Sequence, residues 1–174
     1  MFDRHSREHV SSRLRLREYN YSTPGIYFVT MCTEHRRCLF GTVEHGEVQL
    51  SRAGVVIESW LYDIARWFPG VSIDVATVMP NHVHVLLALT SDSDGRQVEG
   101  TPSVSTLIQW FKTKTTYDYT IGVRTDGWPP FPGRLWQRGF HDRIVRSERE
   151  LDRFRRYIVE NPARWTDDSY NPDQ

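Results

Sequence analysis

The chain has 174 residues, enough for one domain, or for one domain with an appended element, but not comfortably for two. Its residues are 39% hydrophobic and 25% charged with a net charge of zero, which excludes disordered, collagen-like and coiled-coil proteins. No window holds 18 uninterrupted apolar residues, and the first residues lack the apolar core of a signal peptide. The sequence therefore predicts a cytoplasmic protein with no membrane partner.

The zero net charge conceals an uneven distribution of charged residues. Residues 1–40 carry seven Arg against four acids, residues 41–103 three against eight, and residues 134–166 nine against five. Lys112 and Lys114 are the only lysines, and Arg presents a planar fork that suits phosphate and stacks on bases. A GC-rich genome would produce the same Arg bias, so the composition permits nucleic-acid binding without singling it out.

The residue pattern in the first half of the chain predicts an arm, strands and one helix. Residues 1–20 are Arg-rich and polar and predict a basic N-terminal arm. A β-branched and aromatic run predicts a strand over 26–33, and residues 43–48 suggest a short hairpin or loop crossing. Ser51 precedes apolar residues at helical spacing that stop at Pro69.

The second half continues with alternating strands and helices. Strands are predicted near 72–78 and 82–89, and loops over 91–102 and 121–133. A second helix is predicted from about Ser103 to Tyr117, followed after the second loop by a strand near 142–146. The last helix begins at the capping box Ser147–Glu150 and ends at Pro162.

This order of elements is a split βαβ pattern with an extra C-terminal helix. It predicts an α+β fold, a ferredoxin-like (RRM-like) sandwich with helices on one face of a mostly antiparallel sheet. We expect one domain over residues 21–166, between the arm at 1–20 and an acidic tail at 167–174.

Two histidines open the strand after the turn Pro80-Asn81. Residues i and i+2 of a strand point to the same face, so His82 and His84 stand side by side with Cα atoms about 6.5–7 Å apart. Both imidazoles can then bind one divalent metal. The alternative is an ordinary pair of histidines on an exposed strand face, but such a strand would more often open with Val or Thr.

The last helix offers a nucleophile and a further ligand. Tyr157 and Asn161 lie four residues apart and share a helical face. A phenol held over a metal-bound phosphodiester can attack phosphorus and form a covalent phosphotyrosine, and the Asn161 amide oxygen can complete the coordination of the metal. The alternative is that Tyr157 is a packing aromatic and Asn161 a C-cap before Pro162.

Three segments of the sequence resemble the HUH single-tyrosine transposases, and most of all the REP-associated tyrosine transposases within that group. The segments are Val78–His84, Leu135–Phe140 and Arg156–Pro162. The resemblance also extends from Tyr27–Thr30 to Arg37 and Phe40. The resemblance covers most of residues 15–165. It implies a metal-dependent single-stranded DNA endonuclease and strand-transfer enzyme that acts at DNA hairpins through a 5′-phosphotyrosine intermediate and leaves a 3′-OH.

Carried onto this sequence, the resemblance implies that His82, His84 and Asn161 bind Mg²⁺ or Mn²⁺ and that Tyr157 is the nucleophile. Basic residues of the arm and of the two later helices are expected to contact DNA phosphates. They are Arg13, Arg15, Arg17, Lys112, Lys114, Arg153 and Arg156. Related small transposases act as dimers and REP-associated members can act alone, so a homodimer and a monomer both stay open.

Several alternatives stay open at this stage. Arg143 stands where family members often have a histidine, and nearby His141 is a candidate replacement. Tyr117 and Tyr119 are the main rival nucleophiles, and Tyr170 is also available. The rival function is a non-catalytic RRM-like protein that binds hairpin DNA or RNA without cutting it.

Overall fold

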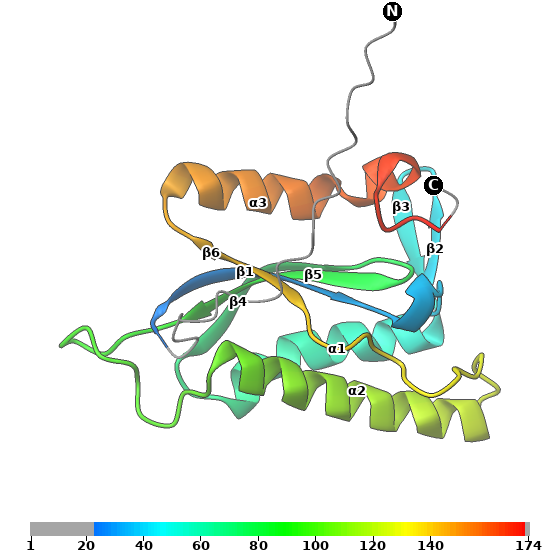
Figure 1. Ribbon diagram of the computed structural model, residues 1–174, viewed down its shortest axis with the longest axis horizontal. Helices are drawn as coiled ribbons and strands as arrows, with labels where there is room; N and C mark the ends of the chain where they lie inside the picture. The colour runs from blue at the N-terminus through cyan, green and yellow to red at the C-terminus, as the bar shows by residue number, and fades with distance from the viewer. Residues whose placement is uncertain (1–22, 173–174) are drawn as a thin grey trace, which may run out of the picture.

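A computed structural model describes residues 23–172 (Figure 1). The predicted arm at 1–20, with Arg13, Arg15 and Arg17, lies outside the described residues. Four strands form one antiparallel sheet in the order β4-β5-β1-β6. The strands are β1 (Gly25–Cys32), β4 (Val71–Val78), β5 (His82–Leu89) and β6 (His141–Val145), and a separate hairpin pairs β2 (Gly41–Glu44) with β3 (Glu47–Leu50).

Helices cover both faces of the sheet. They are α1 (Arg52–Trp67), α2 (Val104–Thr125) and α3 (Glu148–Glu160). In Figure 1, α1 and α2 lie on one side of the sheet and α3 on the other. The α+β, ferredoxin-like prediction is confirmed, and the extra C-terminal helix occupies the face that the other two leave open. Within residues 23–172, none of the helices combines the length and apolarity needed to span a lipid bilayer.

The alternation of side chains along β5 connects the two layers. Val83, Val85 and Leu87 point into the core shared with α1 and α2. Leu86 points the opposite way, into a smaller cluster with Phe154 of α3. Since residues two apart share a face, His82 and His84 lie on the α3 side of the sheet. A strand buried on both faces explains the almost uninterrupted apolar run after the histidines.

Each long helix begins at a serine, as the sequence predicts. The hydroxyl oxygens of Ser51, Ser103 and Ser147 accept hydrogen bonds from backbone N–H groups three residues later, at 3.1, 3.1 and 3.2 Å. These bonds satisfy donors that the first helical turn leaves unpaired. At α3 the Glu150 carboxylate also accepts a bond from the Arg146 N–H at 2.9 Å. This cap fixes where α3 starts, and thereby where its later residues meet the sheet.

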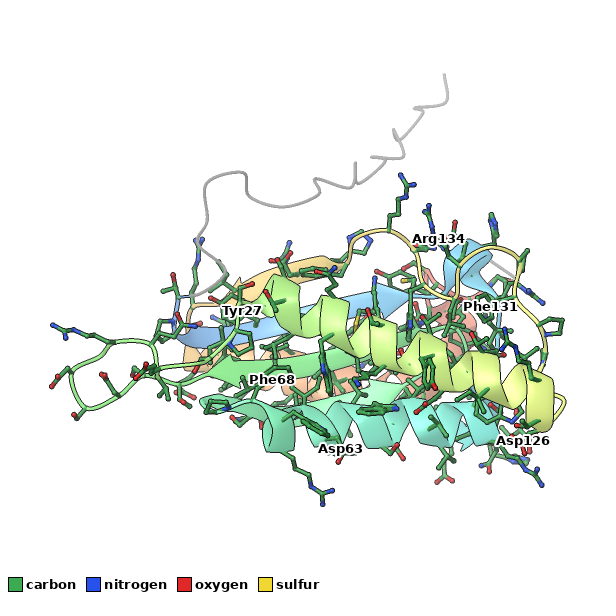
Figure 2. The ribbon with its side chains drawn as sticks, turned by 90° about the horizontal axis from the view of Figure 1, so that it is seen from below. Tyr27, Asp63, Phe68, Asp126, Phe131 and Arg134 are labelled. Atoms are coloured by element: carbon green, nitrogen blue, oxygen red, sulfur yellow. The ribbon has the colours of Figure 1, made fainter. Side chains whose placement is uncertain are left out.

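Helix α2 is two turns longer than the sequence predicts, because it ends at Thr125 and not near Tyr117. The extra turns are held by the segment that follows. The hydroxyl of buried Tyr119 donates to the Pro129 carbonyl at 2.9 Å, and a Cβ added at Gly122 would lie 2.3 Å from the Trp128 ring. Figure 2 shows this segment running beside α2 from Asp126 to Arg134. The prediction of a loop from residue 121 was wrong because these contacts are tertiary.

Candidate functional site

The two histidines that open β5 meet nitrogen to nitrogen. His82 is fully buried and His84 is 1% exposed, and their Nε2 atoms lie 3.1 Å apart. The Nδ1 atom of His84 lies 2.8 Å from the hydroxyl of Thr30, its antiparallel partner on β1. The predicted side-by-side arrangement is therefore present, in the interior of the protein and not on an exposed strand face.

Asn81 fixes the tautomer of His82. The Asn81 Nδ2 atom donates to the carbonyls of Arg36 at 2.9 Å and Tyr170 at 2.8 Å, so its Oδ1 atom is an acceptor. His82 Nδ1 lies 2.9 Å from that oxygen and must carry the proton. The lone pair of His82 is consequently on Nε2, directed at His84, which is the arrangement that metal-binding histidines adopt when the other nitrogen donates to an oxygen.

Both imidazoles are electrically neutral at pH 7. Burial lowers the pKa of His82 to about 4, although the Asp168 carboxylate acts in the opposite direction. Burial also lowers the pKa of His84 well below its usual value, and neighbouring His82 adds to the effect. Neutral imidazoles keep lone pairs available for a metal.

Two oxygen donors stand beside the histidines. Asp168 Oδ2 lies 3.8 Å from His82 Nε2 and accepts a hydrogen bond from Asn161 Nδ2 at 3.0 Å. Ligand atoms of His82, His84 and Asp168 lie within 4.8 Å of one another, in the sole group of this kind among residues 23–172. The Oδ1 atom of Asn161 is buried and has no hydrogen-bond partner of normal geometry among the described residues, and the Asn161 side chain interacts with those of His82 and Tyr157.

This donor set fits a divalent metal. Adjacent ligands of an octahedral ion with bonds of 2.0–2.2 Å are about 3 Å apart, close to the separation of the two Nε2 atoms. The unpartnered Asn161 oxygen would gain a partner from the same ion. Two imidazoles with two oxygens suit Mn²⁺ better than Mg²⁺, which prefers oxygen alone.

The sequence pattern does not single out Asp168, which falls in the predicted acidic tail at 167–174. The described part of that segment is packed against the site. Asp168 N–H donates to Trp165 O at 3.1 Å, Asp168 Oδ1 accepts from Tyr170 N–H at 2.8 Å, and Arg36 Nη1 donates to Ser169 O at 2.7 Å. The available signal was Tyr170, a large aromatic that a solvated tail would not need.

Two tyrosines reach the histidines. The Tyr157 ring lies 5.1 Å from the His84 ring, and the Tyr170 ring lies 4.7 Å from that of His82. Burial raises the pKa of both phenols, and the Asp168 carboxylate also raises that of Tyr157. Tyr117 and Tyr119 lie on α2, across the sheet, and the hydroxyl of Tyr119 is bonded to Pro129. The structure thus brings Tyr157 and Tyr170, and neither α2 tyrosine, to the histidine pair.

The two lysines predicted to contact DNA have different surroundings. Lys112 donates to the carbonyls of Gln137, at 3.0 Å, and Gly139, so its ammonium fixes a loop and is not a free cation. Lys114 is exposed, with its ammonium 5.9 Å from the centre of the Trp60 ring on α1. Neither lysine is on the α3 side of the sheet, where the histidines lie.

The two predicted arginines lie on α3, the helix that carries Tyr157. Arg153 forms an ion pair with Glu150 at 3.3 Å, and Arg156 Nε donates to the Asp152 carbonyl at 3.4 Å. Both side chains are exposed, so they are available to a ligand at this helix.

Arg143, which stands where the resemblance predicts a histidine, and nearby His141 are exposed residues of β6. His141 and Arg143 pair with Thr30 and Phe28 of β1, so both side chains face the α3 side. His141 is nevertheless exposed and lies outside the group of donors that could share a metal. The structure therefore gives His141 no part in the cluster of His82, His84 and Asp168.

Comparisons with known proteins bear on the fold. No family model matches the chain. An uncharacterized protein of Haemophilus influenzae is 27% identical over 176 residues, covering 92% of each chain. A REP-associated tyrosine transposase, solved bound to a REP hairpin, superposes with a TM-score of 0.61 at 17% identity, covering 87% of this chain and 74% of that one. The chain therefore has the fold of the REP-associated tyrosine transposases.

Proposed function

We propose that this protein is a transposase, a metal-dependent endonuclease and strand-transfer enzyme for single-stranded DNA that acts at hairpins. One observation carries the proposal: two neutral imidazoles, two buried oxygen donors and a tyrosine from three separate parts of the chain converge on one point. A packing role would not require this set, because apolar residues fill such a position more stably than buried polar ones do.

His82, His84, Asp168 and Asn161 would hold the metal ion. A divalent ion bound there supplies Lewis-acid stabilisation of the charge that builds on the scissile phosphate. The protein's own part is to present neutral nitrogens, which Asn81 and Thr30 orient through the opposite ring nitrogens. We expect Mn²⁺ to support activity at least as well as Mg²⁺.

Tyr157 is the proposed nucleophile. Its oxygen bonds to phosphorus as its proton leaves, the bond from phosphorus to the 3′ oxygen breaks, and that oxygen departs protonated as a 3′-OH. The covalent 5′-phosphotyrosine conserves the phosphodiester energy, so a 3′-OH can later reverse the step without a nucleotide cofactor. Tyr157 is favoured over Tyr170 because it is carried on a helix, whereas Tyr170 is packed against His82 and beneath the Arg36 guanidinium.

A single chain supplies the whole set of residues. Tyr157 packs on His84 of its own chain, so no second copy is needed to bring the nucleophile to the metal ligands. This supports action as a monomer over a homodimer with exchanged helices.

Binding without cleavage by an RRM-like surface is the rival function. RRM domains bind RNA by stacking bases on an open sheet face. In this protein α3 covers the corresponding face, and Phe28 of β1 stacks on Phe154 of α3 with ring centres 4.5 Å apart. The aromatic that would receive a base is already occupied, which disfavours this alternative.

The test is cleavage of an end-labelled DNA hairpin with single-stranded flanks, with Mn²⁺, with Mg²⁺ and with EDTA. We expect a nicked product and a covalent adduct that survives SDS with either metal and neither product in EDTA. The double variant His82→Ala/His84→Ala should be inactive. His45→Asn is the matched control, because this histidine lies in the exposed β2–β3 turn and its left-handed backbone (φ 54°) suits Asn. Cleavage in EDTA, or by a folded double variant, would refute the proposal.

A further inference from the structure

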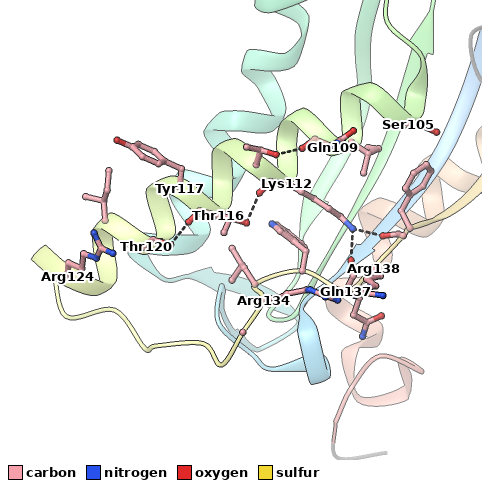
Figure 3. A pocket seen from close by; sticks show the side chains of 18 residues that line it. Ser105, Gln109, Lys112, Thr116, Tyr117, Thr120, Arg124, Arg134, Gln137 and Arg138 are labelled. Atoms are coloured by element: carbon pink, nitrogen blue, oxygen red, sulfur yellow. Dashed lines mark hydrogen bonds between the residues drawn. The ribbon is translucent and has the colours of Figure 1, made fainter.

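A second concave surface lies between α2 and the segment 133–140, away from the histidines (Figure 3). The groove has a volume of about 1130 Å³, and none of the proposed metal ligands or Tyr157 lines it. Pockets that hold small ligands are usually about 300–1,000 Å³. The groove is therefore large enough for a ligand bigger than a typical small molecule.

The charge of the groove is one-sided. Its lining includes Lys112, Arg124, Arg134 and Arg138 and no Asp or Glu. The three arginines are exposed, and within residues 23–172 none of their guanidinium groups has an ion pair or hydrogen bond. In Figure 3, Arg124 and Arg138 mark opposite ends of the groove, with Arg134 between them on the facing segment. In a chain with no net charge, a row of cations along a groove without acidic residues is complementary to a polyanion.

An aromatic side chain accompanies the cations. Tyr117 lines the groove and is 66% exposed, so most of its side chain is accessible to a ligand. A groove that combines cations for the backbone with an exposed ring for a base is typical of proteins that bind single-stranded nucleic acid. Stacking on a side chain requires an unpaired base, so a single strand fits better than a duplex.

The wall of the groove is continuous with the proposed cleavage site. Gln137 N–H donates to the Cys32 carbonyl at 2.9 Å, and Glu34 N–H donates to the Leu135 carbonyl at 2.9 Å. Cys32 is the antiparallel partner of His82. The segment that forms one side of the groove is therefore hydrogen-bonded to the end of β1. That end of β1 pairs with His82, one of the proposed metal ligands.

We propose that the groove binds a single-stranded DNA segment continuous with the cleaved strand. Arg124, Arg134 and Arg138 contact successive phosphates, and Tyr117 stacks on an unpaired base. Lys112 acts indirectly, because its bonds to Gln137 and Gly139 hold the facing wall in place. The choice of DNA as ligand rests on the proposed function, whereas the site itself rests on the geometry and charge of the groove.

The test measures binding of a fluorescent single-stranded oligonucleotide over a salt series. One protein carries Arg124→Gln, Arg134→Gln and Arg138→Gln. The matched control carries Arg52→Gln, Arg66→Gln and Arg96→Gln, which are exposed and do not line the groove. Each phosphate contact contributes about 0.7 to the slope of log K against log salt, so the groove variant should lose about 2 from the slope. At 0.1 M salt, the loss of each phosphate contact should raise Kd about fivefold.

The stacking contact is tested separately. Tyr117→Ala should weaken binding about fivefold or more, and Tyr117→Phe should bind as the unsubstituted protein does, since the ring is retained. Wild-type slope and Kd in the groove variant, or an equal loss in the control, would overturn the proposal. Equally tight binding of a polyglutamate peptide would overturn the nucleic-acid assignment. Covalent adduct formation by the unsubstituted protein is scored independently, so the proposed function can fail while the groove is upheld, and the reverse.

Discussion

Replacing Asp168 by Asn distinguishes between two roles of this carboxylate, that of a metal ligand and that of a purely structural group. Asn retains an oxygen to accept the hydrogen bond from the Tyr170 N–H, so the fold of the segment is kept. The substitution removes the charge that lies 3.8 Å from His82 Nε2 and the acceptor for Asn161 Nδ2. Without metal the buried Asp168 carboxylate has only a neutral imidazole beside it, so removing its charge is favourable. Losing the hydrogen bond from Asn161 is unfavourable by a similar amount, and we expect the free energy of unfolding to change by no more than about 1 kcal/mol.

With metal the two proteins should differ strongly. Removing residues that only orient a metal ligand costs about 10- to 100-fold in affinity, so removing a charged ligand should cost at least 100-fold, about 2.7 kcal/mol. At a concentration of Mn²⁺ 100 times its Kd, the unsubstituted protein gains about 2.7 kcal/mol, or about 5–10 °C in Tm, and the variant gains almost nothing.

Isothermal titration with Mn²⁺ and thermal unfolding with and without the ion measure both effects. Asp167→Asn is the matched control, because this neighbouring carboxylate is exposed and lies outside the cluster of donors. We expect the control to bind Mn²⁺ as the unsubstituted protein does. A Kd for Asp168→Asn within about threefold of the parent would refute the assignment of Asp168 as a ligand.

Three further predictions follow from the same contacts. Tyr157→Phe should abolish the covalent DNA adduct and Tyr170→Phe should not; an adduct that mass spectrometry maps to Tyr170 would reverse the assignment. Gly122→Ala should lower stability by about 1–3 kcal/mol in a urea titration, since the new Cβ would lie 2.3 Å from the Trp128 ring, and an unchanged midpoint would contradict this packing. In EDTA the free energy of unfolding should fall as the pH drops from 6.5 to 4. Burial lowers the pKa of His82 from 6.5 to about 4, so the unfolded chain binds the proton at a higher pH than the folded protein does. The free energy of unfolding should therefore drop by about 3 kcal/mol over this range, and a free energy of unfolding that does not change with pH would exclude the lowered pKa.

The sequence by itself determined the order of the helices and strands, the start of each long helix and the face on which the histidines lie. Side chains alternate along any strand, so the spacing of His82 and His84 placed them together whatever the rest of the chain did. The serine caps are equally local, because each hydroxyl bonds to a backbone group three residues away. Such features depend on short stretches of backbone, and short stretches were predicted well.

Only the tertiary structure decided which distant residues meet the histidines. Asp168 lies 86 positions from His82 in sequence, and no periodicity indicates that a single acid in an irregular segment will lie beside the histidines. Which tyrosines lie beside the histidines was also a non-local matter: Tyr119 and Tyr157 both occupy helices, and they differ in which face of the sheet their helix covers. The length of α2 depended in the same way on contacts with the segment that follows it. Local backbone geometry determines the periodicity of side chains along a helix or strand and the residues that cap a helix. The packing of one element on another determines which side chains come together in a site.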